Sequence, residues 1–182
     1  MIEYKPFWGK LLKMFGWKPI YPERVSRKSV ICVAPHTSNW DFPLGLCYYL
    51  SMGRKPRFLI KKEWFVFPLN LFFKMVGGLA VDRSKKTSTV DQIIEGLATK
   101  VDYNIAVTPE GTRSKRKEWK TGFWRIASGA GIVIELARID YKKKELGIFE
   151  IFTPTGDMEA DIAYIRSKYR ADMAKFPEKY AE

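Results

Sequence analysis

A short apolar run at residues 30–34 stops abruptly at a proline, and the residue after that proline, His36, is the only histidine in the chain. The run is rich in β-branched residues, which favours a buried strand, and a residue that precedes proline is disfavoured in a helix. Apolar residues then repeat at helical spacing over residues 44–50. Pro43 lacks an N–H group and therefore belongs in a first helical turn. The stretch predicts a strand, a turn that contains His36, and a helix that begins near Asp41.

His36 and Asp41 are candidates for a catalytic pair. Histidine is the side chain that changes charge near neutral pH, so a single imidazole leaves one candidate base of this kind. On one continuous helix this spacing would direct the two side chains to different sides, but across a turn the carboxylate can fold back onto the imidazole. A structural alternative stays open, because Ser38-x-x-Asp41 also resembles a capping box and a histidine in a turn can be a plain polar loop residue.

The excess of basic over acidic residues indicates what kind of partner the chain binds. The chain has 182 residues, which predicts one domain with a proper core, and its 32 basic and 20 acidic residues give a net charge of +12. We therefore expect an anionic partner, which could be a phosphate group, a nucleic acid or an acidic membrane surface. Cys32 and Cys47 have apolar or aromatic neighbours and are interpreted as buried thiols in a reducing compartment, not as a disulfide or metal site. The N-terminus has no apolar core of signal-peptide type.

Two apolar stretches suggest contact with a membrane or with the domain core. Residues 4–18 carry aromatic and leucine side chains at near-helical spacing with lysines between them, which predicts an amphipathic helix. This helix could lie in a membrane interface or dock on the core. Residues 64–76 are the most apolar stretch but fall short of the roughly twenty residues that a bilayer span needs. We interpret them as a helix that is partly core and partly membrane-facing, and we predict no transmembrane segment.

The remainder of the chain alternates between predicted strands and helices. The predicted strands cover residues 57–60, 77–83 (after a glycine turn), 104–108, 132–139 and 146–152. The predicted helices cover residues 87–100 and 121–130, and a last helix that places Met158, Ile162, Ile165, Tyr169, Met173 and Phe176 on one face. This alternation predicts an α/β fold, a layered single domain with a largely parallel mixed sheet flanked by helices. We expect the amphipathic helix within residues 1–18 and the domain over residues 19–182.

Three predicted strands end in unusual polar groups. These are His36 with Asp41, Asp82 with Arg83, and residues 110–114. In parallel sheets with helical crossovers the carboxyl ends of the strands gather at one edge, where ligands bind. The coincidence therefore predicts one site built from three strand ends.

The same stretches resemble the motifs of the glycerolipid (lysophosphatidic acid) acyltransferase family. His36-Thr-Ser-Asn-Trp-Asp41 matches the H-x4-D motif, and Gly78-Leu-Ala-Val-Asp-Arg83 resembles the second motif. Thr108-Pro-Glu-Gly-Thr-Arg-Ser114 resembles the F-P-E-G-T-R-S motif, with Thr108 in place of phenylalanine. The order and spacing also agree. Residues 132–137 depart from the fourth motif, because they lack the prolines of the usual V-P-I-V-P-V run.

The resemblance implies acyl transfer from a thioester to a lipid hydroxyl. His36 would take the proton of the attacking hydroxyl, while Asp41 would hold the imidazole tautomer and stabilise its charge. Direct transfer needs no nucleophilic serine or cysteine. We expect no bound cofactor and no metal, with acyl-CoA or an acyl carrier protein thioester as the donor.

The resemblance also implies a set of substrate-binding residues, which are Arg83, Glu110, Gly111, Thr112, Arg113 and Ser114. Arg83 and Arg113 would hold a phosphate, because the guanidinium fork matches phosphate oxygens, although Arg83 could instead form a surface pair with its neighbour Asp82. The backbone N–H groups of Gly111 and Thr112 would bind an anion or the developing oxyanion. Glu110 would orient Arg113 or the backbone, or contact an acceptor hydroxyl.

The predicted function is an O-acyltransferase of the 1-acylglycerol-3-phosphate type, which converts lysophosphatidic acid to phosphatidic acid. We expect a cytoplasmic protein that is peripheral on the inner face of the cell membrane, with a lysophospholipid acceptor and an anionic membrane surface as partners. One alternative keeps the chemistry and changes the acceptor, for example to an amino-acid-based lipid. An alternative of another class, a basic nucleic-acid-binding module, lacks any helix-turn-helix, zinc or RNA-recognition motif.

Overall fold

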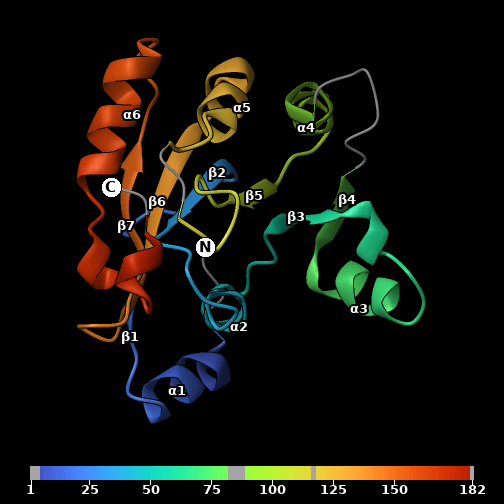
Figure 1. Cartoon of the computed structure of the whole chain (residues 1–182). Coiled ribbons are helices and arrows are strands. Elements are labelled where there is room, and N and C mark those ends of the chain that lie inside the picture. Colours follow the sequence, from blue (N-terminus) through green and yellow to red (C-terminus); the bar gives the residue numbers. More distant parts are fainter. Residues whose placement is uncertain (1–4, 82–88, 116–117, 181–182) are drawn as a thin grey trace.

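The computed structural model describes residues 5–81, 89–115 and 118–180. Within these ranges seven strands form one sheet (Figure 1). The strands are β1 (Lys18–Ile20), β2 (Lys28–Ala34), β3 (Arg57–Lys61), β4 (Gly78–Val81), β5 (Tyr103–Val107), β6 (Val133–Asp140) and β7 (Glu145–Phe152). The α-helices are α1 (Pro6–Met14), α2 (Asp41–Ser51), α3 (Leu69–Val76), α4 (Thr89–Ala98), α5 (Gly122–Ala130) and α6 (Met158–Ser167). Short 3-10 turns are η1 (Lys62–Trp64), η2 (Ala171–Met173) and η3 (Pro177–Lys179).

β2 lies in the middle of the sheet, and the strands that follow it in the sequence are added first on one side of it and then on the other. The strand order is β1-β7-β6-β2-β5-β3-β4. After β2 the chain builds β3 and β4 on one side, returns to β5 beside β2, and continues to β6 on the other side. β2 pairs in parallel with both β5 and β6, whereas β7 runs antiparallel to β6. The predicted α/β fold class, with a largely parallel mixed sheet flanked by helices, is confirmed.

β2 is buried on both of its faces because helices cover both sides of the sheet. Val30, Cys32 and Ala34 belong to one core with residues of α4, α5 and α6, and Ile31 belongs to a second core with residues of α1 and α2. Each fully buried Val or Ile side chain stabilises the fold by about 1.5–3 kcal/mol. Cys47 packs with the second core, so the two free thiols, Cys32 and Cys47, lie on opposite sides of the sheet.

The N-terminal helix docks on the domain and also keeps an exposed apolar face. α1 packs on α2 through the buried Leu12, and Trp17 beyond the helix is buried as well. The helix is shorter than the predicted residues 4–18, and Gly16 follows it with a positive φ of 77°. The apolar side chains that stay about two-thirds exposed or more are Phe7 (66%), Met14 (73%) and Phe15 (67%). Docking on the core and contact with a membrane are thus possible through different faces of α1.

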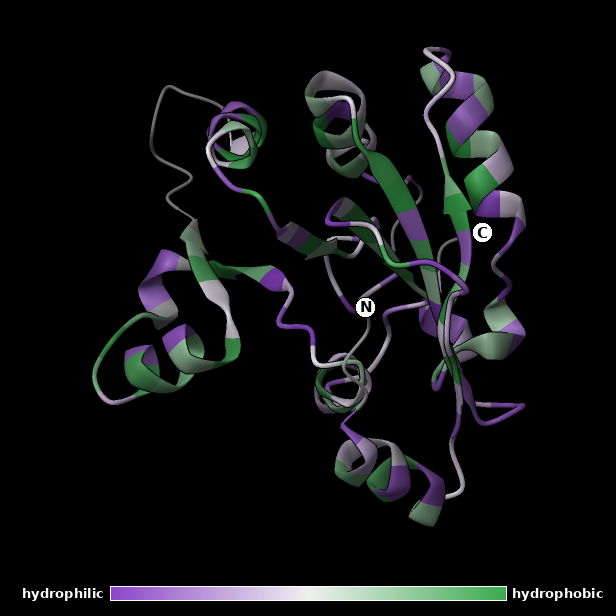
Figure 2. Cartoon of the chain, turned by 180° about the vertical axis from the view of Figure 1, so that it is seen from behind, coloured by the Kyte–Doolittle hydropathy of each residue, from purple (hydrophilic) through white to green (hydrophobic). Residues whose placement is uncertain are grey.

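The most apolar stretch of the chain is helical only in its second half, because α3 begins after Pro68. Gly77 ends α3 with a φ of 97°, and a Cβ there would lie 2.6 Å from the Pro56 carbonyl oxygen. The stretch forms an outlying part of the molecule in Figure 2, where green segments alternate with purple ones. Its exposed side chains include Val66, Phe67, Leu69, Leu71, Phe72 and Met75. No helix in the described part of the chain is long and apolar enough to cross a bilayer.

The C-terminal segment differs from its prediction as a single helix that reaches Phe176. α6 ends at Ser167, and two 3-10 turns follow. Just beyond α6, the buried Tyr169 donates its hydroxyl proton toward the carbonyl oxygens of Cys32 (3.1 Å) and Ala137 (3.3 Å) in the sheet. The long-helix prediction is wrong because these contacts hold the chain against the sheet, and Phe176 is left 37% exposed.

Candidate active site

The register of the parallel strands brings three chain segments to one edge of the sheet. Cys32 of β2 is aligned with Val107 of β5 and with Leu136 of β6. Because parallel strands advance together, the residues that follow β2 lie level with those that follow β5 and β6. The His36 turn, defined as residues 35–41, therefore lies beside the loop after β5 and the turn after β6.

His36 and Asp41 face each other across the His36 turn. The imidazole Nδ1 lies 3.1 Å from Asp41 Oδ2, and the Asp41 side chain is only 2% exposed while that of His36 is 18% exposed. The atoms are within ion-pair distance, but the ring is not aligned for a linear hydrogen bond. Since Nδ1 faces Asp41, Nε2 is directed away from the carboxylate and can take up a proton.

The capping alternative describes the same turn. The Ser38 backbone N–H donates to Asp41 Oδ2 at 2.9 Å, and the Trp40 N–H donates to Ser38 Oγ at 3.2 Å. These are contacts of the kind made by a capping box, in which an acidic side chain reaches back to the residue that starts the helix. Here α2 begins at Asp41 with Trp40 as its N-cap and without a side-chain cap hydrogen bond, so Asp41 Oδ2 holds the backbone of the preceding turn and faces the imidazole with the same oxygen.

Tyr141, directly after β6, contacts the other oxygen of Asp41. Its hydroxyl donates to Asp41 Oδ1 at 2.6 Å. Burial and the neighbouring Asp41 carboxylate raise the pKa of the Tyr141 hydroxyl far above its usual value, so the proton stays on the tyrosine. Tyr141 was not predicted from the sequence, because no local pattern marks a tyrosine at a strand end and only the pairing of β2 with β6 brings it to Asp41.

Glu110, in the loop after β5, is buried against the His36 turn. Its Oε1 accepts a hydrogen bond from the His36 backbone N–H at 2.6 Å, and the residue is only 1% exposed. Burial raises the pKa of Glu110 from 4.5 to about 7, although the hydrogen bond from His36 acts in the opposite direction. Three roles were expected for Glu110, and the contact seen in the structure is the one with the backbone, namely with the N–H group of His36.

The rest of the third motif forms a tight turn that leads to the surface. Gly111 has a φ of 64°, and its N–H donates to the Thr108 carbonyl oxygen at 3.0 Å. The Gly111 N–H is therefore used within the turn, whereas the Thr112 N–H has no partner among the described residues. Arg113 and Ser114 are exposed, and Arg113 makes no ion pair or hydrogen bond with a described residue. Its guanidinium group is free to meet a ligand.

Two further basic residues, Lys120 and Arg83, are candidates for binding an anion near this turn. Lys120 packs on Gly111 so closely that a Cβ at Gly111 would lie 2.8 Å from Lys120 Cε and 3.0 Å from its Nζ. The Lys120 backbone N–H also donates to the Pro109 carbonyl oxygen at 2.7 Å. Arg83 lies outside the described residues, so its expected place in the site stays a prediction. Lys120 adds a cationic group that was not among the predicted site residues.

The strand at the position of the fourth motif contains a buried ion pair. Glu135 of β6 is fully buried, and its carboxylate accepts hydrogen bonds from both terminal nitrogens of Arg54, at 3.1 and 3.2 Å. Such a bidentate pair is the geometry that guanidinium and carboxylate groups favour. β6 lacks the prolines of the fourth motif, and its Glu135 instead forms an ion pair with the segment after α2.

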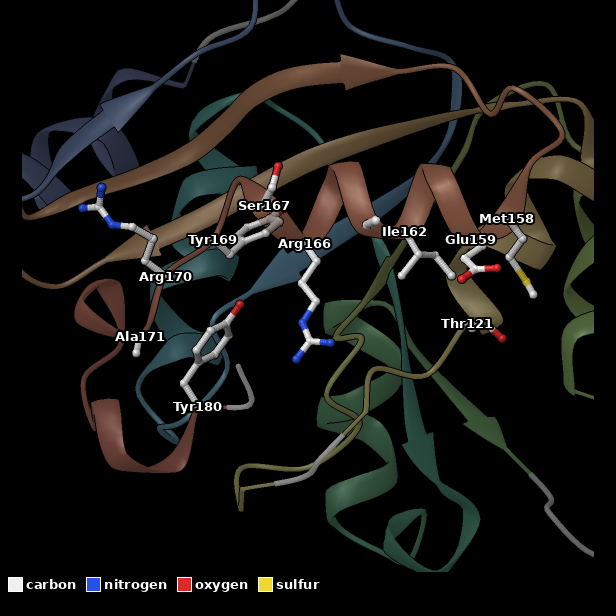
Figure 3. A pocket seen from close by; sticks show the side chains of 11 residues that line it. Thr121, Met158, Glu159, Ile162, Arg166, Ser167, Tyr169, Arg170, Ala171 and Tyr180 are labelled. Atoms are coloured by element: carbon white, nitrogen blue, oxygen red, sulfur yellow. The ribbon is translucent and has the colours of Figure 1, made fainter.

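An open groove of about 920 Å³ lies elsewhere, along α6 (Figure 3). Arg166 extends from α6 into it, and Tyr169 and Tyr180 lie on one side of it (Figure 3). Neither His36 nor Asp41 lines this groove. The candidate active site is therefore the edge of the sheet where His36 and Asp41 lie, because neither of these side chains reaches the groove.

Comparisons with known proteins identify the family of the chain and a structure of similar fold. A family model described as Acyltransferase matches residues 18–136, a range that holds the His36 turn and the third motif. The crystal structure of the 1-acyl-sn-glycerophosphate (LPA) acyltransferase PlsC from Thermotoga maritima is similar, with a TM-score of 0.61. The similarity covers 90% of this chain and 73% of that chain at 21% sequence identity, and it shows a shared fold. No curated protein matches the chain.

Proposed function

The chain belongs to the acyltransferase family, and on this premise we propose that it transfers a fatty acyl group from a thioester donor to the free hydroxyl of a lysophospholipid. The observation that carries the proposal is the pair of His36 Nδ1 and buried Asp41 Oδ2, 3.1 Å apart at the carboxyl edge of the sheet. The proposed acceptor is lysophosphatidic acid and the product is phosphatidic acid. The likeness of the fold to an LPA acyltransferase supports this choice.

His36 is the proposed general base. Its Nε2 takes the proton of the acceptor hydroxyl while the hydroxyl oxygen attacks the thioester carbonyl carbon. Asp41 stabilises the imidazolium that forms. The tetrahedral intermediate then collapses, the carbon–sulfur bond breaks, and the leaving sulfur takes the proton back from the imidazolium. An ester and a free thiol result, and His36 returns to its starting state.

Direct transfer without an acyl-enzyme fits the state of the two cysteines. Burial raises the pKa of the Cys32 thiol far above its ordinary value, and burial also raises the pKa of Cys47. A thiol that stays protonated is a poor nucleophile. The acceptor hydroxyl activated by His36 is therefore the proposed nucleophile.

The turn of the third motif is the proposed anion site. Arg113 is exposed and unpaired among the described residues, and Lys120 packs on Gly111 at the same turn. Both groups could bind the phosphate of the acceptor, the guanidinium in a bidentate way. The free Thr112 N–H could serve the developing oxyanion. Glu110 holds this turn against the His36 turn, and Arg83 remains a further proposed phosphate ligand.

An anionic membrane surface is the proposed source of the acceptor. The exposed apolar side chains of α1 and of the stretch around α3 are the two surfaces that support contact with lipid. α1 combines this apolar face with exposed Lys10 and Lys13, and basic residues beside apolar ones are typical of helices that lie in a membrane interface. We propose a peripheral position on the inner face of the cell membrane.

The proposal is tested by assaying the purified protein against a panel of lysolipids. The panel contains lysophosphatidic acid, other lysophospholipids and an amino-acid-based lysolipid, each with acyl-CoA and with acyl carrier protein thioester. We expect transfer to lysophosphatidic acid with at least one donor. Preference for an acceptor that lacks a phosphate monoester would favour the alternative acceptor. Absence of transfer to every lysolipid would contradict the proposed function.

A further inference from the structure

Tyr141 holds the carboxylate of Asp41 from the side opposite to His36. Asp41 Oδ2 accepts the Ser38 N–H at 2.9 Å and faces His36 Nδ1 at 3.1 Å, while Oδ1 accepts, among the described residues, only the Tyr141 hydroxyl, at 2.6 Å. A distance of 2.6 Å is typical of a charge-assisted hydrogen bond from a hydroxyl to a carboxylate. Without it, a buried carboxylate oxygen would have no donor, which is costly in a protein interior.

Two segments that are distant in the sequence fix the position of Tyr141. Its backbone N–H donates to the Met173 carbonyl oxygen at 2.8 Å, in the C-terminal segment. Its ring meets the buried Trp17 edge to face, with ring centroids 5.1 Å apart. The ammonium group of Lys175 lies 5.9 Å from the ring centroid. The hydroxyl therefore reaches Asp41 from a ring that the surrounding structure holds in place.

We propose that Tyr141 is a positioning residue for the acyl transfer, which acts by fixing the orientation and the charge of the Asp41 carboxylate that faces His36. This inference rests on the proposed function, in which His36 is the base. With both oxygens bound, the carboxylate cannot turn about its Cβ–Cγ bond, so Oδ2 stays directed at Nδ1. The hydroxyl also withdraws part of the carboxylate charge and thereby tunes how strongly Asp41 favours a proton on the imidazole.

The charged groups around this unit can be named from the elements packed against it. His36 and Asp41 come from the His36 turn, Glu110 from the loop after β5, and Lys175 from the C-terminal segment. Tyr141→Phe changes none of them and removes one hydroxyl. The imidazole faces a carboxylate with one donor fewer, so its protonated form becomes more stable and His36 should titrate at higher pH.

The test exploits the single histidine of the chain, whose imidazole signals in NMR spectra need no assignment among several. We would titrate the wild type, Tyr141→Phe and Tyr48→Phe. Tyr48 is a matched control, because it packs in the same core as Tyr141 but its hydroxyl donates to the Ile20 carbonyl oxygen and not to Asp41, and accepts from the Ile148 N–H at 3.0 Å. We expect the His36 midpoint to rise by about 0.5 pH or more in Tyr141→Phe and to stay unchanged in Tyr48→Phe.

The same variants are assayed for acyl transfer. We expect kcat of Tyr141→Phe to fall about ten- to hundredfold while the KM values for both substrates stay within about twofold, because Tyr141 is not proposed to touch a substrate. An unchanged His36 midpoint, an equal change in both variants, or an unchanged kcat would overturn the proposal. The titration needs no substrate, so a wild type that titrates as expected but transfers no acyl group would contradict the proposed function instead.

Discussion

The buried carboxylate of Glu110 accepts a hydrogen bond from the backbone N–H of His36 at 2.6 Å, although 74 positions of sequence separate the two residues. This contact joins the loop after β5 to the His36 turn. The exposed end of the third motif begins with the next residue, Gly111. The proposed anion-binding turn and the proposed catalytic pair are thus fixed to each other through one buried side chain.

The first prediction concerns the stability of the fold as a function of pH. Burial raises the pKa of Glu110 to about 7 in the folded protein, compared with an ordinary value of 4.5. Between these values the folded state binds more protons than the unfolded state. The stabilising contribution is therefore complete below about pH 4.5 and is lost as the pH rises to about 7, with a magnitude of up to about 3 kcal/mol.

Glu110→Gln removes this titration and can keep the hydrogen bond from the His36 N–H. The free energy of unfolding of the variant minus that of the wild type should therefore increase as the pH rises from 4.5 to 7. Urea unfolding at several pH values in this range measures the difference. A difference that does not change with pH would contradict the buried, protonated state of Glu110.

The sequence alone supports much of the fold, because local patterns reveal buried strands and amphipathic helices. The run that became β2 and the turn after it are recognisable from their apolar residues and from the prolines. β1 was not predicted, since an edge strand of three residues that contains Pro19 has almost no periodic pattern. The apolar residues after Ser167 are spaced as in a helix, but α6 ends at Ser167 and the Tyr169 hydroxyl contacts the backbone of the sheet.

The candidate site was predictable only in part. His36, Asp41 and the third motif stand out in the sequence through their residue types and order. Tyr141 does not, because its role depends on the register between β2 and β6, which no local pattern determines. Glu135 was likewise not predicted, because its partner Arg54 lies 81 positions away in the sequence and only the fold brings the two side chains together.

The buried ion pair of Arg54 and Glu135 gives a prediction about stability. Arg54→Met leaves the fully buried Glu135 carboxylate without its cation and should lower the free energy of unfolding by about 3–5 kcal/mol. The double variant Arg54→Met/Glu135→Met should recover most of this loss. Urea unfolding of the two single variants and the double variant measures the coupling. Additive losses would show that the two side chains do not stabilise each other.

Arg113 should determine the preference for a phosphate on the acceptor. Its exposed guanidinium has no partner among the described residues, so Arg113→Ala removes a ligand contact and not a structural one. We expect KM for lysophosphatidic acid to rise about ten- to hundredfold and KM for an acceptor without phosphate to change little. Arg125→Ala, an exposed arginine on α5, controls for the lost charge. Equal effects on both acceptors would speak against a phosphate contact.

The exposed aromatic residues of α1 and of the stretch before α3 should contribute to membrane binding. Phe7, Phe15 and Phe67 are 66%, 67% and 80% exposed, so their replacement by serine removes little from the core. We expect the triple variant to sediment with anionic phospholipid vesicles about tenfold more weakly than the wild type. Val101→Ser, at a position 69% exposed between α4 and β5, is the matched control. Loss of binding in both variants, or in neither, would contradict these surfaces as the contact.

The most direct measurement of the central claim is the turnover of His36→Ala. Purified wild type and variant are assayed side by side for acyl transfer to lysophosphatidic acid, and thermal unfolding confirms that both are folded. Because no other imidazole is present in the chain, we expect turnover to fall by about two to four orders of magnitude. A folded His36→Ala variant that transfers acyl groups at the wild-type rate would contradict the assignment of His36 as the base.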